Sequence, residues 1–306
     1  MHAMDVRQLE MFRAVAEEGT FTKAAERLHV SQSAVSRQLL LLEEELKTLL
    51  FHRTGRGVTL TDPGRLLLTT ANRINRDLND VVSQISQTQE LQRGVLKLGA
   101  GMTVCLYVLP KLLKKFRSRY RNLDLRVAAG TSDEILRLLR LNELDLALLT
   151  LPIVAADLEV RPVLKEEMVV ATASGHVLTR ERHVDPRKLA RHPMVLFESG
   201  SNTRHVLDEF FREQEIPVNV VMETENVEII KAMVGSGLGI TIIPYAAIAA
   251  EARRGHFGWA RIRGHRLYRE TGWVYVKSDS LRRSITEMLR VFDLMKDQFG
   301  GKPPGR

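Results

Sequence analysis

Four polar side chains between residues 32 and 37 have the chemistry needed to read the edges of DNA bases. They are Gln32, Ser33, Ser36 and Arg37. An arginine can donate two hydrogen bonds to guanine, a glutamine can pair twice with adenine, and a serine hydroxyl can donate or accept with either. No acidic residue that would repel phosphate occurs from Ser31 to Leu42. These side chains predict base contacts, provided that one element presents them together.

The surrounding pattern predicts two helices joined by a tight turn, with these side chains at the start of the second. That helix begins after Ser31, whose hydroxyl can cap it, and its inner stripe is apolar at Val35, Leu39 and Leu42. A short helix over "KAAERL", capped by Thr22, precedes the turn at "HV", and an earlier helix covers Val6–Glu18. In this helix-turn-helix arrangement, the leading end of the second helix enters the major groove of DNA.

A basic hairpin is predicted directly after the helix-turn-helix, over "LLFHRTGRGVTLTDPG" (Leu49–Gly64). Two glycines allow its turn, and Arg53 and Arg56 lie near its tip, where they can reach phosphates or the minor groove. The alternative is an ordinary hairpin beside a helical packing module. Residues 1–61 hold eight Lys/Arg and eight Asp/Glu, so the net charge of +8 does not by itself indicate DNA binding.

A long helix is predicted from Pro63 onward, because no proline or internal glycine follows Gly64 before residue 93. Its apolar residues recur at heptad spacing: Leu67, Ala71, Ile74, Leu78, Val81 and Ile85. This pattern favours pairing with the same helix of a second copy, and packing on its own domain is the alternative. A dimer would place two recognition helices on successive half-sites of DNA.

From Val95 onward, strands and helices alternate in two similar halves, which predicts two α/β subdomains with mostly parallel sheets. The segments Glu166–Ser174 and Thr271–Ser278 are expected to cross between the subdomains. The last helix, Leu281–Phe299, is expected to return to the first subdomain, and residues 301–306 form a tail.

Three loops that follow predicted strands carry hydroxyl and amide side chains at the starts of helices. The candidates for ligand binding are Thr103, Thr131, Ser132, Ser201, Asn202 and Thr203. Open α/β sheets bind ligands beyond the carboxyl ends of their strands, and helix N-termini favour anions. The loops therefore predict a small anionic effector, with ordinary helix capping as the alternative for each loop. Arg204 can pair with that anion or with a nearby acid.

Catalytic and metal chemistry are not indicated. The nine histidines lack metal-ligand spacing, and Cys105 is the single cysteine, either a packed thiol or a redox sensor. "GSGLGI" (Gly235–Ile240) follows a predicted helix and precedes a strand, the reverse of a dinucleotide site, so it predicts a helix end and a turn. We expect no catalytic residue, no metal and no cofactor other than the effector.

The composition favours a protein of the cytoplasm. No run of about 18 apolar residues is present, so no membrane span is expected. The charged N-terminus differs from a signal peptide, and a lone cysteine fits a reducing compartment.

The whole chain resembles the LysR-type transcriptional regulators, most specifically over residues 4–64. The resemblance rests on "LEMFRAVAEEGTF", "FTKAAERLHVSQSAVSRQLLLLEEEL" and "LFHRTGRGVTLTDPG". It implies that the positions of Gln32, Ser33, Ser36 and Arg37 meet DNA and that Arg53 belongs to a wing. It also implies dimers or tetramers and a regulatory domain that is similar to periplasmic binding proteins. The family usually has glycine after "EEL", where this chain has Lys47.

These observations together predict an α+β multidomain protein. We expect a winged helix-turn-helix over residues 4–61, a dimerisation helix over 62–92, and a two-subdomain α/β effector domain over 93–300. Subdomain I would comprise 93–165 and 270–300, and subdomain II would comprise 166–269. The expected function is a transcriptional regulator that binds double-stranded DNA as a homodimer or homotetramer. An α/β enzyme and a cytoplasmic solute-binding protein are the alternatives.

Overall fold

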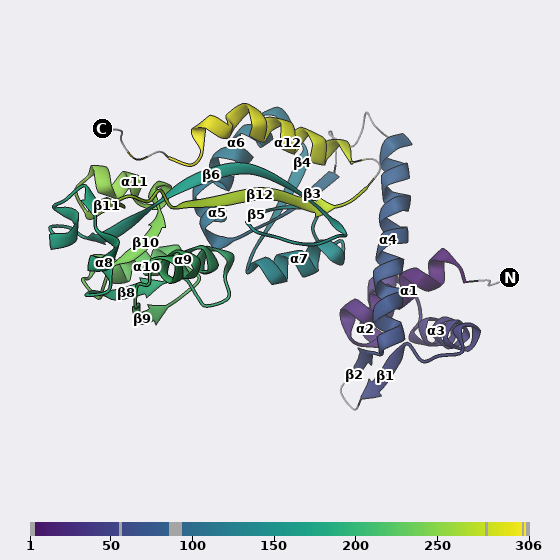
Figure 1. The fold of residues 1–306 in the computed structure, drawn as a ribbon. Coiled ribbons are helices and arrows are strands. Elements are labelled where there is room, and N and C mark those ends of the chain that lie inside the picture. Colours follow the sequence, from purple (N-terminus) through teal and green to yellow (C-terminus); the bar gives the residue numbers. More distant parts are fainter. Residues whose placement is uncertain (1–3, 55–56, 86–93, 279–280, 302, 304–306) are drawn as a thin grey trace. The chain divides into compact units, whose positions relative to one another are not determined.

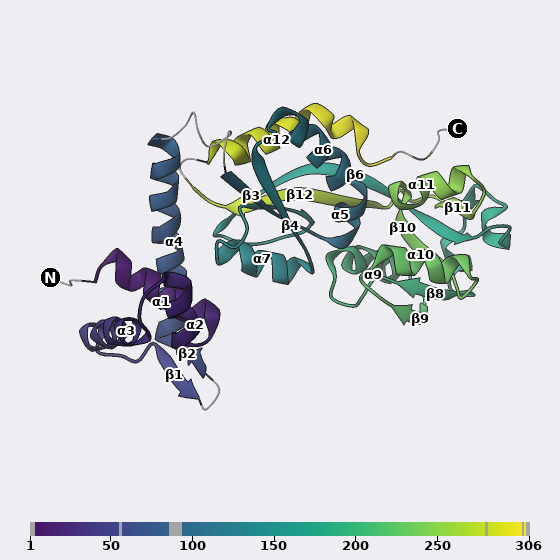
Figure 2. The ribbon, with the colours of Figure 1, turned by 180° about the vertical axis from the view of Figure 1, so that it is seen from behind.

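The computed structural model describes residues 4–54, 57–85, 94–278, 281–301 and 303. The chain divides into two compact units, which are described separately. The first holds residues 1–86 with 140–143, and the second holds residues 87–139 with 144–306. Figures 1 and 2 show the order of the elements in each unit from opposite sides.

The N-terminal unit packs three short helices, a hairpin and one long helix around a common apolar core. Its elements are α1 (Val6–Glu18), α2 (Phe21–Leu28), α3 (Gln32–Leu46), β1 (Phe51–Thr54), β2 (Gly57–Leu60) and α4 (Asp62–Ile85). The predicted inner stripe of α3 is confirmed, because Val35, Leu39 and Leu42 are all buried.

Side-chain caps set the starts of the helices. The Ser31 hydroxyl accepts a hydrogen bond from the backbone N–H of Ala34 at 3.2 Å, as predicted for α3. The predicted cap of α2 is wrong: Thr20, not Thr22, accepts from the N–H of Lys23 at 3.3 Å. The helix therefore begins at Phe21, whose ring lies 6.2 Å from that of Phe51 and so contributes to the core.

The hairpin is attached to the helices by close backbone approaches. The N–H of Val58 donates to the carbonyl of Gly19 at 2.9 Å. A Cβ added at Gly57 would lie 2.5 Å from that same carbonyl, so this position requires glycine. One carboxylate oxygen of Glu43 accepts from the N–H groups of Leu50 and Phe51, which connects the end of α3 to β1.

The heptad pattern of α4 divides between two environments. Ala71 is buried, and Leu67 and Ile74 pack on the core of the same unit. Leu78 and Val81 are 44% and 52% exposed within this chain. The side chain of Ile85 lies outside the described residues. Intradomain packing therefore accounts for the first half of the pattern, and the second half is available to a partner.

The second unit is built on one long sheet that joins two lobes. Lobe I contains β3 (Gly94–Ala100), α5 (Met102–Tyr107), α6 (Leu109–Arg119), β4 (Leu123–Ala129), α7 (Ser132–Arg140), β5 (Leu146–Thr150), β12 (Tyr268–Val276), α12 (Arg283–Met295) and a short 3₁₀ turn (Lys296–Gln298). Helix α12 packs on the core of lobe I, so the predicted return of the last helix is confirmed.

Lobe II has its own apolar core. It contains a 3₁₀ turn (Val177–Thr179), β7 (His183–Val184), α8 (Pro186–Leu189), β8 (Pro193–Leu196), α9 (Asn202–Glu213), β9 (Asn219–Glu223), α10 (Val227–Gly235), β10 (Thr241–Pro244), α11 (Tyr245–Arg253) and β11 (Phe257–Ile262). Helix α10 ends at Gly235, and a turn with Gly237 at φ +87° leads to β10. The prediction that "GSGLGI" forms a helix end and a turn is therefore confirmed.

The crossover strands make the sheet mixed rather than mostly parallel, which corrects the sequence prediction. The strand order is β4-β3-β5-β12-β6-β11-β7, with β10 also paired to β6. Strand β3 is parallel to β4 and β5, but β12 is antiparallel to β5 and to β6 (Leu158–Ala173). Because β6 runs from lobe I into lobe II and β12 returns beside it, the lobes share continuous backbone hydrogen bonding (Figure 1).

No helix in the described part of the chain is long and apolar enough to cross a membrane. Among the same residues, no group of three or more potential metal ligands occurs.

Candidate DNA interface and effector cavity

The front of α3 presents its polar side chains on the face opposite the buried stripe. Gln32, Ser33 and Arg37 are exposed, and Ser36 is half-buried. Within the described residues, the Arg37 guanidinium forms no hydrogen bond or ion pair, whereas Arg13, Arg27 and Arg65 of the same unit are paired. Its donors are therefore free to meet an external acceptor.

The predicted wing is present, but its tip is not described. Arg53 lies in β1, and its backbone pairs with that of Val58 in β2. The side chain of Arg53, and all of Arg56, lie outside the described residues.

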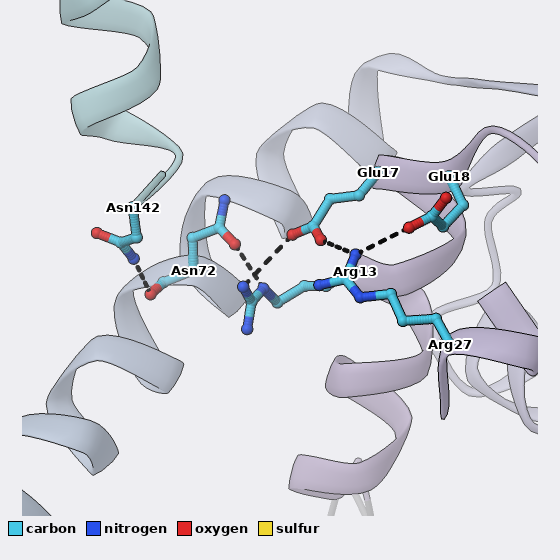
Figure 3. Close-up of polar contacts among 6 residues, drawn as sticks. All are labelled: Arg13, Glu17, Glu18, Arg27, Asn72 and Asn142. Atoms are coloured by element: carbon cyan, nitrogen blue, oxygen red, sulfur yellow. Dashed lines mark hydrogen bonds and ion pairs between the residues drawn. The ribbon is translucent and has the colours of Figure 1, made fainter. Parts of the chain in front are cut away.

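A polar network connects α1, α2 and α4 (Figure 3). The Nε of Arg13 donates to the side-chain oxygen of the buried Asn72 on α4 at 2.6 Å. Arg27 on α2 forms ion pairs with Glu17 at 2.5 Å and with Glu18 at 3.3 Å. The hydrogen bond to Glu17 raises the pKa of Arg27. Because Arg13 also pairs with Glu17 at 3.4 Å, these contacts form one connected set between the three helices.

A cavity in the second unit lies where the loops of the two lobes meet. All six candidate ligand-binding residues line it: Thr103, Thr131 and Ser132 from lobe I, and Ser201, Asn202 and Thr203 from lobe II. Its volume for a water-sized sphere is about 60 Å³. The loops converge because they follow the carboxyl ends of β3, β4 and β8 at the same edge of their sheets.

The six side chains are not equally available to a ligand. The hydroxyls of Thr131 and Ser201 each accept a hydrogen bond of 3.2 Å from a backbone N–H group, and so cap the starts of α7 and α9. Asn202 donates to the carbonyls of Thr150, at 2.6 Å, and Pro152, so it bridges the lobes. The hydroxyls of Thr103 and Ser132 form no hydrogen bond with any described residue.

An arginine that the sequence did not single out also lines the cavity. Arg269 in β12 is 1% exposed and donates twice to Glu166, which is equally buried, at 3.1 and 2.5 Å. Its remaining nitrogen lies 3.4 Å from the Thr203 hydroxyl. The signal in the sequence was a charged residue within an apolar strand, which is rarely buried without a partner.

Glu225, just before α10, is the second charged residue of the lining that sequence reasoning missed. Burial, together with the nearby carboxylates of Glu198 and Glu134, raises the pKa of Glu225. It forms no hydrogen bond or ion pair with any residue in the described ranges.

Arg204 and Cys105 have structural partners. Arg204 pairs with Glu223 at 2.6 Å and with Asp208 at 2.7 Å. The sequence had left open whether Arg204 pairs with a bound anion or with a nearby acid, and the structure shows the acid. The Cys105 thiol lies 3.7 Å from the carbonyl of Ala100, and burial raises its pKa. A raised pKa lowers the thiolate fraction, which favours a packed thiol over a redox sensor.

A second polar cluster connects the lobes beside the cavity. The Tyr107 hydroxyl on α5 donates to Glu228 on α10, and the buried Lys231 donates to that hydroxyl at 2.8 Å. Lys231 also pairs with Glu251 at 2.6 Å. Burial and the bond to Glu228 raise the pKa of Tyr107 to about 12, so the cluster keeps its charge pattern at neutral pH. Residue 107 lies one helical turn beyond Thr103, which places the cluster close to the cavity.

Comparison with known families accounts for both sites. Residues 6–65 match the bacterial regulatory helix-turn-helix of the LysR family, and residues 89–295 match the LysR substrate binding domain. The chain belongs to the LysR family of transcriptional regulators. It is therefore a DNA-binding regulator with an effector-binding domain, and not an enzyme. The family resemblance and the fold class predicted from the sequence are confirmed.

Similar regulators extend over nearly the whole chain. The transcriptional activator CmpR of Synechocystis is 34% identical over 276 residues, which cover 90% of each chain. CfxR of Cupriavidus necator is 31% identical over 313 residues, covering 100% of this LysR-family chain and 98% of CfxR.

Solved structures share the fold. A full-length OxyR variant of Pseudomonas aeruginosa has a TM-score of 0.82 at 25% identity, with 96% of each chain covered. Full-length CbnR in complex with its target DNA has a TM-score of 0.63 at 23% identity, over 94% of this chain and 98% of CbnR. The effector-binding domain of QuiR in complex with shikimate has a TM-score of 0.61 at 20% identity, over 68% of this chain and 99% of that domain. The last two show likeness of fold alone.

Proposed function

We propose that this LysR-family regulator reads DNA through the front of α3 and responds to a small acidic effector bound between its two lobes. The observation that carries the effector site is the convergence of all six loop residues, with Arg269, on one cavity. The regulator would act in the cytoplasm, where it has access to the chromosome.

The proposed DNA contacts are Gln32, Ser33, Ser36 and Arg37, with Arg53 and Arg56 of the wing reaching the backbone. Their support is the exposure of the first turns of α3 and the absence of a partner for Arg37 within the described part of the unit. Arginine and glutamine at these positions can each form two hydrogen bonds with one base in the major groove.

An acidic group on the effector is supported by the donors of the cavity. The hydroxyls of Thr103 and Ser132 have no partner in the described ranges, and the N-termini of α7 and α9 open toward the same space. Arg269 adds a guanidinium, although Glu166 offsets its charge. Hydrogen bonds, rather than net positive charge, would therefore hold the acid.

Homodimer formation through α4 is supported by the exposed Leu78 and Val81. Effector binding would change how the lobes close, and through the dimer the spacing of the two recognition helices. Such control requires a ligand with unequal affinity for the two arrangements.

The test is a thermal-shift screen of the full-length protein against small organic acids. A ligand that binds only the folded state raises the melting temperature. The shift should become smaller in Thr103→Val and in Ser132→Ala, which remove the unpartnered hydroxyls, but not in Thr286→Val, an exposed threonine of α12. Equal shifts in all four proteins would place the ligand outside the cavity.

A further inference from the structure

The cavity lining contains two charged side chains of opposite sign, and only one is neutralised by the protein. These are Arg269 and Glu225. Arg269 is 1% exposed and its charge is offset by Glu166, which is also 1% exposed. Arg269 and Glu166 therefore offset each other, and Glu225 is the charged side chain of the lining that has no partner among the described residues.

The Glu225 carboxylate lies in an unfavourable environment for an anion. It is half-buried, it has no hydrogen bond or ion pair with the described residues, and two further carboxylates act on it. One of these, Glu134, accepts from the N–H of Thr131 at 2.9 Å on another wall of the cavity. A carboxylate that is partly removed from water without a partner is costly, and a cation placed beside it relieves that cost.

A separate feature of the lining points to a ligand acid. Thr103 is 7% exposed, lines the cavity, and its hydroxyl has no partner among the residues that the structure describes. A buried hydroxyl of this kind is normally satisfied, here by something inside the cavity. Thr103 belongs to lobe I, whereas Glu225 lies two residues before the start of α10 in lobe II.

We propose that the effector is a small zwitterion, whose carboxylate binds at Thr103 and whose ammonium group binds at Glu225. This inference rests on the proposed effector role of the cavity and makes Glu225 the residue that selects amino-bearing acids over plain acids. The volume of about 60 Å³ leaves room for roughly four to six water-sized groups, which suits a molecule of the size of a small amino acid. Because its two charged ends meet different lobes, such a ligand would favour one relative position of the lobes.

The experiment compares three sets of compounds by thermal shift and calorimetric titration on the full-length protein. The first set is the common amino acids, the second is the corresponding acids without the amino group, and the third is the corresponding amines without the carboxylate. We expect a member of the first set to bind, and its matched members of the other two sets to bind at least 10-fold more weakly.

Two substitutions then assign the ends of the ligand. Glu225→Gln keeps the shape but removes the charge, so it should weaken the amino acid about 10–100-fold, because hydrogen bonds between charged groups contribute most. Glu225→Gln should bind the acid without the amino group at least as tightly as the wild type does. A misfolded variant could not give this result. Thr103→Val should weaken both ligands, and Glu209→Gln, an exposed acid on α9, should change neither.

The possible failures are distinguishable. If plain acids bind best, lose affinity in Thr103→Val and are indifferent to Glu225→Gln, the cavity is the effector site but the zwitterion is wrong. If a compound binds and neither Thr103→Val nor Glu225→Gln affects it, the cavity is not its site and the proposed function fails as well. If no compound of the three sets binds, the zwitterion assignment is also wrong.

Discussion

Lys47 ends α3 in a backbone conformation that favours glycine. Its φ and ψ are 51° and 34°, in the left-handed region, and the N–H of Thr48 reaches back to the carbonyl of Glu43 at 3.1 Å. The family usually has glycine at this position, where this chain has Lys47. The structure shows that the helix still ends there, because Glu43 and the hairpin attached to it fix the path of the chain.

Replacing Lys47 with glycine should therefore stabilise the N-terminal unit. A side chain in the left-handed region costs about 1–2 kcal/mol, and the greater freedom of glycine in the unfolded chain offsets part of the gain. We expect Lys47→Gly to raise the free energy of unfolding by about 0.5–1 kcal/mol, measured by scanning calorimetry of the full chain. Lys47→Ala, which retains the conformational cost, is the control. A gain in both variants, or in neither, would contradict the argument.

At the residue scale, the sequence identified which loops line the cavity but not the role of each side chain in it. Hydroxyl and amide residues after strands identified the three loops. Spacing alone could not show that Thr131 and Ser201 serve as caps, because a capping hydroxyl and a ligand-binding hydroxyl occupy the same place in the sequence. Arg269 and Glu225 come from elements distant in the chain, and only folding brings them to the cavity.

The apolar pattern of α4 lies in two different environments. Its first half covers the core of its own unit, where Asn72 also accepts the hydrogen bond from Arg13 (Figure 3). Its second half presents Leu78 and Val81 to solvent. A heptad repeat specifies a stripe on a helix but not what covers that stripe, so the sequence left both alternatives open.

Substituting the exposed half of the stripe should separate a dimer into monomers. Leu78→Glu with Val81→Glu would place like charges where two copies of α4 meet, while the buried first half remains intact. We expect the molar mass measured by light scattering to fall by half or more, and DNA affinity to fall with it. Arg73→Glu, on an exposed face of the same helix, is the control. A molar mass unchanged by the double substitution would exclude this stripe from the interface.

The sheet of the second unit shows a limit of pattern analysis at the level of elements. Repeated strand-helix order correctly predicted parallel neighbours such as β3 with β4, and β8 with β9. It did not predict the antiparallel pairing of β12 with β5 and β6, because apolar strands buried on both faces have the same composition in either direction. The sequence predicted that segments of β6 and β12 cross between the lobes. It did not predict that the two strands pair with each other continuously through backbone hydrogen bonds.

In the whole molecule, the proposed DNA contacts and the proposed effector site lie in different units, and α4 is proposed to pair two copies. Family membership establishes that the chain is a DNA-binding regulator with an effector-binding domain. In the function proposed above, the residues at the front of α3 select the DNA sequence that the molecule binds. Residues 1–61 are balanced in charge, but the front of α3 has no acidic residue, so the proposed DNA contacts depend on local placement rather than on bulk charge.

The most direct test of the account is the affinity of the full-length protein for a duplex that it has itself selected from random sequence. Wild type and Arg37→Ala are compared on that duplex and on an unselected one at the same salt concentration. We predict that Arg37→Ala weakens binding to the selected duplex by about 1–3 kcal/mol and changes binding to the unselected duplex far less. Arg212→Ala, an exposed arginine of α9, should leave both unchanged. Unaltered affinity of Arg37→Ala for the selected duplex would contradict the claim that the front of α3 reads DNA bases.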